Sequence, residues 1–504
     1  MNKKYIILIF IVSLLYVVYH LATLSYSPLP WFDEVSFASI TNSYIKAHTF
    51  FPEAIDIAVP WQNAMYGPVY FVLQAWVVKL FGLTMFSFRI SNLLFGFANL
   101  YLIYRICLHL KFRPAATFLT VGILALERSY NQYLHSGRMD SMTLFFFLAS
   151  FLVFVTITPK HNYKWLLPAA ATGALLACSA LTTPRILFAF SFYFCYFFYE
   201  IYNTRRSGIR DTLLKYVTII ITFCALFYTW IFVHFGSVQN YIYTNYTSNA
   251  IIQGHVGTTA EALRFNSSMV YFAYAFACFV ILLIYGRAYK NMKLVLLTVP
   301  VMLSFMLLVG GGLSGRYFAM VAPFAILLFT GVSASLYDHI IFRGINYTIL
   351  AVLLGAFVLK AAYIADTYHQ RDPVYNEQRI MQYIPPHSTV AADFEYYYFA
   401  RHKQCYFQSL SENGTPYQAF DYYIARNYEY FIFSKHNVEH ENYKNYVFRG
   451  RYKLIATVDD EPHHGLLTGL ISRLGYKVTE SYACYIYKYI GTDKVYQPEA
   501  SKLN

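Results

Sequence analysis

Long apolar runs are the feature that most restricts what this chain can fold into. Runs of about 20 apolar residues recur between Tyr5 and Ala365, each long enough to cross a bilayer core of roughly 30 Å as an α-helix. Over the whole chain, 57% of the residues are hydrophobic and 13% are charged, which excludes an ordinary soluble protein. The sequence therefore predicts an all-α polytopic membrane domain.

The composition changes after Ala365. Residues 366–504 carry 16 of the 26 acidic residues and 15 of the 39 basic ones, so this part is nearly neutral and compatible with water. A helical segment over Val374–Tyr383 precedes several β-rich runs, and this alternation predicts a small α/β domain. The β-rich runs are Ser388–Ala392, Tyr428–Ser434, Tyr452–Val458 and Ala483–Ile490. We therefore expect a membrane domain over residues 1–365 and a soluble domain over residues 366–504.

Loop charges predict how the chain is oriented in the membrane. Tyr5–Leu24 reads as an uncleaved first span, and residues 25–82 as an outer loop. Within this loop, Pro68–Phe81 would cover only about 21 Å as a helix, so we expect it to lie in the membrane interface. Ten further spans bring the total to eleven crossings: 88–108, 115–130, 141–158, 165–182, 186–202, 213–233, 268–286, 294–309, 317–336 and 346–365. Most Lys and Arg residues of the membrane domain then lie on the same side of the membrane as the N-terminus. Basic loops favour the cytoplasmic side, so we expect the N-terminus inside and the soluble domain outside.

The same topology brings charged residues of both signs to the outer ends of the spans. These residues are Asp33, Glu34, Asp140, Arg138, Arg185 and Arg316. A carboxylate close to lipid is costly and by default marks a site for a substrate, an ion or a proton. Structural explanations stay open for each residue. The acids would suit helix N-termini, for example of a helix that begins at Val35, and an Arg side chain can reach lipid headgroups.

Several short motifs follow one another in a characteristic order. They are Phe32-Asp33-Glu34, Tyr66-Gly-Pro-Val-Tyr-Phe, Lys79-Leu-Phe-Gly, Phe88-Arg89-Ile, Arg138-Met-Asp140, Leu181-Thr-Thr-Pro-Arg185 and Arg316-Tyr-Phe-Ala-Met-Val-Ala-Pro323. This ordered set resembles the GT-C glycosyltransferases of the protein O-mannosyltransferase and lipid A aminoarabinose transferase kind. The resemblance covers most of residues 1–336. It implies the GT-C fold, a polyprenyl-phosphate sugar as donor and transfer on the non-cytoplasmic face, with a bacterial inner membrane as the expected location.

The acidic residues fit the chemistry that this resemblance implies. Transfer from a lipid phosphosugar needs a base that takes a proton from the acceptor hydroxyl. We expect Asp33 to be this base and Glu34 to orient Asp33 or the acceptor. Asp140 is a second expected catalytic carboxylate, which binds sugar hydroxyls or shares the base role.

The basic residues would hold the donor phosphate as negative charge builds on the leaving group. Arg316 follows a Gly-rich turn, and its guanidinium matches phosphate bidentately. The other expected donor contacts are Arg138, Arg185, Tyr66 and Tyr317. Two positions depart from the aminoarabinose transferase pattern, because Tyr66-Gly67 stands where a Lys is common and Arg185 stands near the place of a second Lys. Arg89 is interpreted as a membrane anchor and His135 as a polar loop residue.

We therefore expect an inverting glycosyltransferase that acts on a hydroxyl of a lipid, a glycan or a protein. Its partners would be the bilayer, the lipid-linked donor and the acceptor, without nucleic acid, metal or cofactor. A transporter or flippase for a lipid-linked sugar is the main alternative, and a catalytically inactive scaffold is another. Cys405 and Cys484 either form a disulfide in an oxidising compartment or remain two free thiols.

Overall fold

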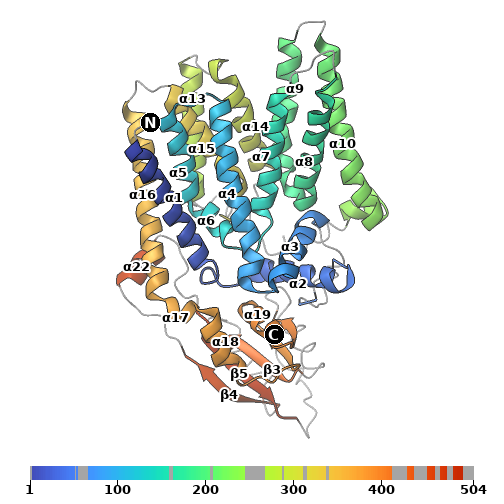
Figure 1. Cartoon of the computed structure of the whole chain (residues 1–504), viewed down its shortest axis with the longest axis vertical. Helices are drawn as coiled ribbons and strands as arrows, with labels where there is room; N and C mark the ends of the chain where they lie inside the picture. The colour runs from blue at the N-terminus through green and yellow to red at the C-terminus, as the bar shows by residue number, and fades with distance from the viewer. Residues whose placement is uncertain are drawn as a thin grey trace, which may run out of the picture.

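A helical bundle and a smaller α/β domain follow each other along the longest axis of the computed structural model (Figure 1). The structure describes residues 3–50, 53–54, 66–157, 163–204, 208–243, 267–285, 289–309, 315–335, 340–410, 428–435, 451–459, 466–473 and 481–491. The predicted fold class, an all-α membrane domain with a C-terminal α/β domain, is confirmed.

The bundle consists of long apolar helices that run side by side (Figure 1). They are α1 (Lys3–Thr23), α4 (Met85–His109), α5 (Pro114–Leu126), α7 (Asp140–Thr156), α8 (Leu166–Thr182), α9 (Ser191–Asn203), α10 (Ile209–Phe235), α13 (Ser267–Ile284), α14 (Met292–Val309), α15 (Gly315–Ser335) and α16 (Ile340–Asp366), with short helices α6 (Arg128–Leu134), η1 (Pro184–Phe190) and η3 (Tyr289–Asn291) between them. Every predicted span contains one of these helices. Within the described ranges, α4, α10 and α16 have the length and hydropathy of membrane spans, whereas the other apolar helices are shorter. The count of eleven crossings stays a prediction.

One predicted span, 115–130, is interrupted at Glu127. α5 ends at Leu126, and Glu127 has φ −62° and ψ 132°, an extended conformation that the α-helical ladder cannot continue through. Its buried carboxylate accepts a hydrogen bond of 2.7 Å from the backbone N–H of Tyr130 and so caps α6. An acidic residue inside an apolar run thus starts a new helix here, which apolar length alone does not reveal.

Helices α2 (Phe32–Ala47) and α3 (Pro68–Phe81) lie between the bundle and the C-terminal domain (Figure 1). α3 has the predicted bounds because Pro68 suits the first helical position and Gly82, at φ 77°, ends the helix. Its side chains Trp76, Leu80 and Phe81 are exposed. An apolar exposed face on a short helix is what contact with the membrane interface requires.

The C-terminal domain is built on a five-stranded mixed sheet of order β2-β1-β3-β5-β4. Its elements are α17 (Tyr368–Arg371), α18 (Pro373–Met381), β1 (Thr389–Ala392), η5 (Phe394–Tyr396), α19 (Tyr397–His402), β2 (Tyr406–Ser409), β3 (Tyr430–Ser434), β4 (Tyr452–Val458), α22 (Leu466–Arg473) and β5 (Cys484–Tyr489). β1 pairs in parallel with β2 and β3, and β5 pairs antiparallel with β3 and β4. The four predicted strands are present, and the short strand β2 was not predicted.

Cys405 and Cys484 are both buried and both free. Cys405 precedes β2 and Cys484 begins β5, with β1 and β3 between these two strands. Neighbouring strands lie about 4.8 Å apart, so the two residues are separated by well over the roughly 7 Å that a disulfide tolerates between Cα atoms. The disulfide alternative is therefore wrong for this structure.

The C-terminal domain shares a hydrophobic core with α2 and α3. This core joins Val35 and Phe37 of α2 with Tyr398 and Phe399 of α19. The Phe32 and Phe394 rings meet edge to face at 5.3 Å between centroids. The C-terminal end of α19 approaches the turn between α3 and α4. The C-terminal domain is thus packed onto the helices that lead into the bundle.

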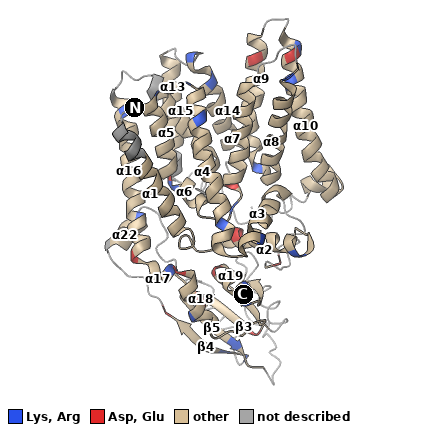
Figure 2. Ribbon diagram, in the orientation of Figure 1, with Lys and Arg blue, Asp and Glu red and all other residues tan. Residues whose placement is uncertain are grey.

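Charged residues gather toward the two ends of the bundle and are sparse along its middle (Figure 2). The last residues of α9 and the first residues of α10 lie at the end of the bundle that faces away from the C-terminal domain (Figure 1). There Lys215 forms an ion pair with Glu200, whose carboxylate also accepts a hydrogen bond of 2.9 Å from Tyr216. α2 and the C-terminal domain occupy the opposite end.

One contact between the two domains depends on the protonation of His402. Its Nδ1 donates to Glu377 Oε2 at 2.9 Å, and its Nε2 donates to the Leu83 carbonyl, before α4, at 3.2 Å. Only the protonated imidazolium can donate from both nitrogens. The hydrogen bond to Glu377 raises the pKa of His402, against the opposing effect of burial.

We predict that this contact stabilises the protein less as the pH rises. Because the folded-state pKa of His402 is raised, its contribution is complete below the ordinary His pKa of about 6.5 and is lost as the pH passes the raised value. The difference between the thermal midpoints of the wild type and His402→Gln should therefore decrease as the pH rises from about 6 to about 8. His369→Gln, a change of another His of the C-terminal domain, should keep the wild-type slope. A pH-independent difference would contradict the prediction.

Candidate active site

The acidic pair Asp33-Glu34 lies in the first turn of α2. The helix begins at Phe32, after Trp31 in an extended conformation, and the Val35 N–H donates to the Trp31 carbonyl at 3.0 Å. Free N–H groups and the helix dipole favour negative charge in this turn. The structural alternative, in which the acids lie at a helix N-terminus, is therefore correct as to their position, although the helix begins three residues before Val35. Their individual partners show what else they do.

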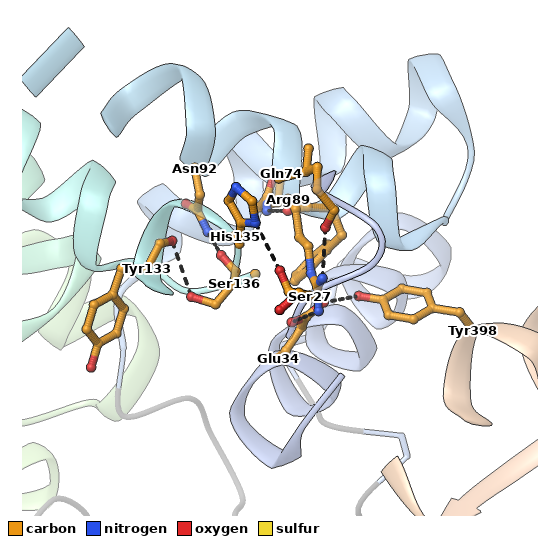
Figure 3. Close-up of polar contacts among 12 residues, drawn as sticks. Ser27, Glu34, Gln74, Arg89, Asn92, Tyr133, His135, Ser136 and Tyr398 are labelled. Atoms are coloured by element: carbon orange, nitrogen blue, oxygen red, sulfur yellow. Dashed lines mark hydrogen bonds and ion pairs between the residues drawn. The ribbon is translucent and has the colours of Figure 1, made fainter. Parts of the chain in front are cut away.

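Glu34 is neutralised by Arg89 of α4 (Figure 3). Arg89 Nε and Nη2 donate to the two carboxylate oxygens, each at 2.9 Å, and both side chains are fully buried. Arg89 Nη1 also donates to the Leu24 carbonyl at 2.9 Å, and the Tyr398 hydroxyl donates to Glu34 Oε1 at 3.3 Å. Glu34 therefore has no room for a substrate and instead fixes α2 on α4. The interpretation of Arg89 as a membrane anchor is wrong.

Asp33 points to a different arginine. Arg138, from the loop before α7, forms ion pairs with both Asp33 and Asp140, with 2.7 Å between Arg138 Nε and Asp140 Oδ2. The guanidinium lies between two aromatic rings, 5.2 Å from the centroid of Trp31 and 5.3 Å from that of Tyr133. Stacking and ion pairing together fix a planar guanidinium. Two carboxylates therefore share one arginine.

Exposure separates the three predicted carboxylates. The Asp33 side chain is 22% exposed, whereas those of Asp140 and Glu34 are 4% and 0% exposed. A group that takes a proton from a substrate must be within hydrogen-bond reach of it. Among these three carboxylates, Asp33 is the one that a substrate can approach without rearrangement.

Polar side chains of α4 and α3 hold the loop that carries Arg138. Asn92 Nδ2 donates to the Ser136 carbonyl at 2.5 Å, and the Tyr70 hydroxyl donates to the Gly137 carbonyl at 2.8 Å. Gly137 leaves room for close packing, because a Cβ there would overlap the Phe88 ring and lie 2.8 Å from Glu34 Cγ. The loop is thereby fixed beside both acidic residues.

His135 is a residue of this loop, as predicted, and its side chain is buried. It is 1% exposed, and its Nδ1 donates to the Ser27 carbonyl at 2.9 Å (Figure 3). Its Nε2 lies 2.6 Å from Nδ1 of His20. With Nδ1 of a neutral His135 protonated, Nε2 must accept, so His20 is the donor. Burial lowers the pKa of His135 and keeps it neutral. This contact ties the loop to α1.

Two of the predicted donor contacts, Tyr66 and Arg185, lie together. The Arg185 guanidinium is 5.7 Å from the centroid of the Tyr66 ring, which meets the Phe37 ring edge to face at 5.5 Å. Gly67 permits this arrangement, because a Cβ there would lie 2.7 Å from the Leu181 Cα. Phe37 follows Asp33 by four residues on α2, so both occupy the same face of the helix. Arg185 and Asp33 thus border one side of α2.

The remaining predicted donor contacts are placed less directly. Arg316 and Tyr317 lie in the first turn of α15, and their side chains lie outside the described part of the structure. Arg138, expected at the donor phosphate, is engaged by two carboxylates. In the described part of the chain, no group of three or more His, Cys, Asp and Glu side chains is arranged to hold a metal ion, so we assign no metal ligands.

Tyr398 and Arg89 are the site residues that sequence reasoning missed. Arg89 carried a signal, since an arginine within an apolar helix has to find a partner, and few acids precede Asp366. Tyr398 carried none, because the C-terminal domain is rich in Tyr and its contact with Glu34 spans 364 positions of sequence.

Comparisons with known proteins agree with this architecture. The family model for dolichyl-phosphate-mannose-protein mannosyltransferases matches residues 9–244. The crystal structure of ArnT from Cupriavidus metallidurans bound to undecaprenyl phosphate is similar at a TM-score of 0.58 and 12% identity, over 96% of this chain and 98% of that chain. The apo ArnT structure has a TM-score of 0.56 with the same identity and coverage. These two likenesses show the fold.

A partial likeness links the chain to the Saccharomyces cerevisiae protein O-mannosyltransferase Pmt1-Pmt2 complex bound to the sugar donor. Its TM-score is 0.38 at 18% identity, over 47% of this chain and 34% of that chain, which is too low to support an argument. No curated protein matches the sequence. The family match over residues 9–244, a little under half of the chain, and the shared fold agree with the resemblance drawn from the motifs: the chain is similar to the dolichyl-phosphate-mannose-protein mannosyltransferases over this stretch and has the fold of ArnT.

Proposed function

We propose that this protein moves a sugar from a polyprenyl-phosphate donor to a hydroxyl group of an acceptor, with Asp33 as the general base. The observation that carries the proposal is the contrast between the two adjacent acids. Glu34 is buried and neutralised by its own arginine, whereas Asp33 is partly exposed and shares Arg138 with Asp140. A carboxylate that shares its arginine with a second acid and that a substrate can reach suits proton abstraction.

In the proposed reaction, the acceptor oxygen attacks the anomeric carbon of the donor sugar as its proton passes to Asp33. The bond between the anomeric carbon and the phosphate oxygen breaks, and polyprenyl phosphate leaves with the bonding electrons. A single displacement of this kind inverts the anomeric configuration. Fixing both substrates beside Asp33 supplies much of the rate through orientation. The proposed reaction uses no metal ion and no cofactor.

Asp140 and Arg138 act on Asp33 in this proposal. Arg138 is held between Trp31 and Tyr133 and donates to Asp140 at 2.7 Å, so it keeps the Asp33 carboxylate in one orientation. This role replaces direct binding of the donor phosphate by Arg138.

Arg185 and Arg316 are our candidates for the cations that hold the phosphate as it leaves. Arg185 lies beside Tyr66, on the face of α2 that carries Asp33. The related ArnT structure contains undecaprenyl phosphate, and we propose a donor of the same polyprenyl-phosphate class. The sugar could be a hexose or a pentose, and the acceptor a lipid, a glycan or a protein.

Turnover of purified protein tests the proposal. We expect the wild type to release polyprenyl phosphate from one member of a panel of polyprenyl-phosphate sugars, and Asp33→Asn to lower this rate by about 10²–10⁴-fold. Asp211→Asn, at the opposite end of the bundle, is the matched control and should keep the wild-type rate. No release, together with movement of labelled lipid across liposome bilayers, would instead favour a flippase.

We also propose that the N-terminus is inside and that the active site and the C-terminal domain face outside, in a bacterial inner membrane. The excess of Lys and Arg in the loops at the far end of the bundle supports this orientation. Labelling of intact cells with a membrane-impermeant maleimide provides the test, with the wild type reporting the background of native Cys. Gln404→Cys should react in intact cells, and Asn203→Cys only after permeabilisation. The reverse pattern would overturn the orientation.

A further inference from the structure

Helix α19 of the C-terminal domain contacts three separate segments of the membrane domain. Tyr398 donates to Glu34 at 3.3 Å, Arg401 Nη2 lies 3.4 Å from Glu53 Oε2, and His402 contacts the Leu83 carbonyl at 3.2 Å. These contacts come from one helix of six residues. They fix the helix directly over the start of α2.

We propose that the C-terminal domain positions the catalytic base, with Tyr398 as the positioning residue that acts through Glu34. The inference rests on the proposed function, in which Asp33 takes the proton. It assigns to the C-terminal domain a part in catalysis, in addition to covering the site. Tyr398 touches neither substrate nor reacting atoms in this view.

The geometry around Glu34 supports this role. Glu34 Oε1 accepts hydrogen bonds from Arg89 Nε at 2.9 Å and from the Tyr398 hydroxyl, so one oxygen joins α4 of the bundle to α19 of the C-terminal domain (Figure 3). Asp33 is the preceding residue in the same helical turn, and Arg138 holds it from a third direction. A shift of Glu34 therefore moves the backbone that carries Asp33.

The Tyr398 hydroxyl is suited to act as a permanent donor. Tyr398 is 1% exposed. Burial is the larger cause and the negative charge of Glu34 the second, and both raise the pKa of its phenol well above the ordinary value. The phenol thus keeps its proton over the whole range in which an enzyme works. A buried carboxylate needs each of its hydrogen bonds, because water cannot replace a missing donor.

Tyr398→Phe tests the role of the hydroxyl while keeping the packing of the ring. Tyr396→Phe is a matched control, since Tyr396 is also buried but its hydroxyl lies 3.5 and 3.4 Å from the Tyr482 and Ala483 carbonyls of its own domain. We expect Tyr398→Phe to lower kcat about 5- to 10-fold and to leave the KM for the donor unchanged. This loss corresponds to part of the free energy of a hydrogen bond to a charged group. Tyr396→Phe should keep the wild-type kcat. Both variants should unfold at similar temperatures.

The outcomes separate this inference from the proposed function. Failure of the wild type to release polyprenyl phosphate would overturn the proposed function and the inference that rests on it. Normal turnover by the wild type and by both variants would overturn the role of Tyr398 alone. A lower rate of Tyr398→Phe that merely follows a lower fraction of folded protein would also overturn it, because a positioning residue lowers kcat of the folded enzyme.

Discussion

The buried ion pair between Glu34 and Arg89 is the interaction on which the architecture of the site depends. Removing two charges from water is expensive, and the pair is tolerated because its geometry is bidentate and because the Leu24 carbonyl and the Tyr398 hydroxyl each add a hydrogen bond to it. Loss of either partner would leave an uncompensated buried charge, at a cost of about 3–5 kcal/mol. The pair therefore fixes the start of α2 on α4 with little freedom.

This arrangement gives two adjacent carboxylates different roles. Consecutive residues of a helix point about 100° apart, so Glu34 faces α4 while Asp33 faces Arg138 and the Asp140 carboxylate. Glu34 has a whole arginine to itself, but Asp33 has only a share of one. Environment, not residue type, thus decides which of the two acids is enclosed by its own arginine and which one a substrate can reach.

Sequence reasoning predicted the elements better than the partners. Apolar runs and the bounding Pro68 and Gly82 predicted the helices well, since both signals are local. The sequence did not reveal that the helix is interrupted at Glu127, because a carboxylate that caps a new helix cannot be told from an acid at the end of a span without its hydrogen-bond partner. The pairing of Arg89 with Glu34 joins positions 55 apart, and that of His20 with His135 joins positions 115 apart. Only packing selects such partners, so a motif could place the acids close together but could not tell which of them is buried against an arginine and which is partly exposed.

The position of α2 also explains why a membrane bundle and a water-exposed domain share one core. A polyprenyl chain is soluble in lipid, whereas the hydroxyl acceptor of the proposed reaction needs a polar approach, so their reacting atoms have to meet at the boundary between the two solvents. α3 presents exposed Trp76 and Leu80 on one side of this boundary, and α19 covers the other side. A base on a flexible loop there would be misplaced by each change in either domain. Because α2 is held by α4, by the loop before α7 and by the C-terminal domain, movement of Asp33 requires all three supports to yield.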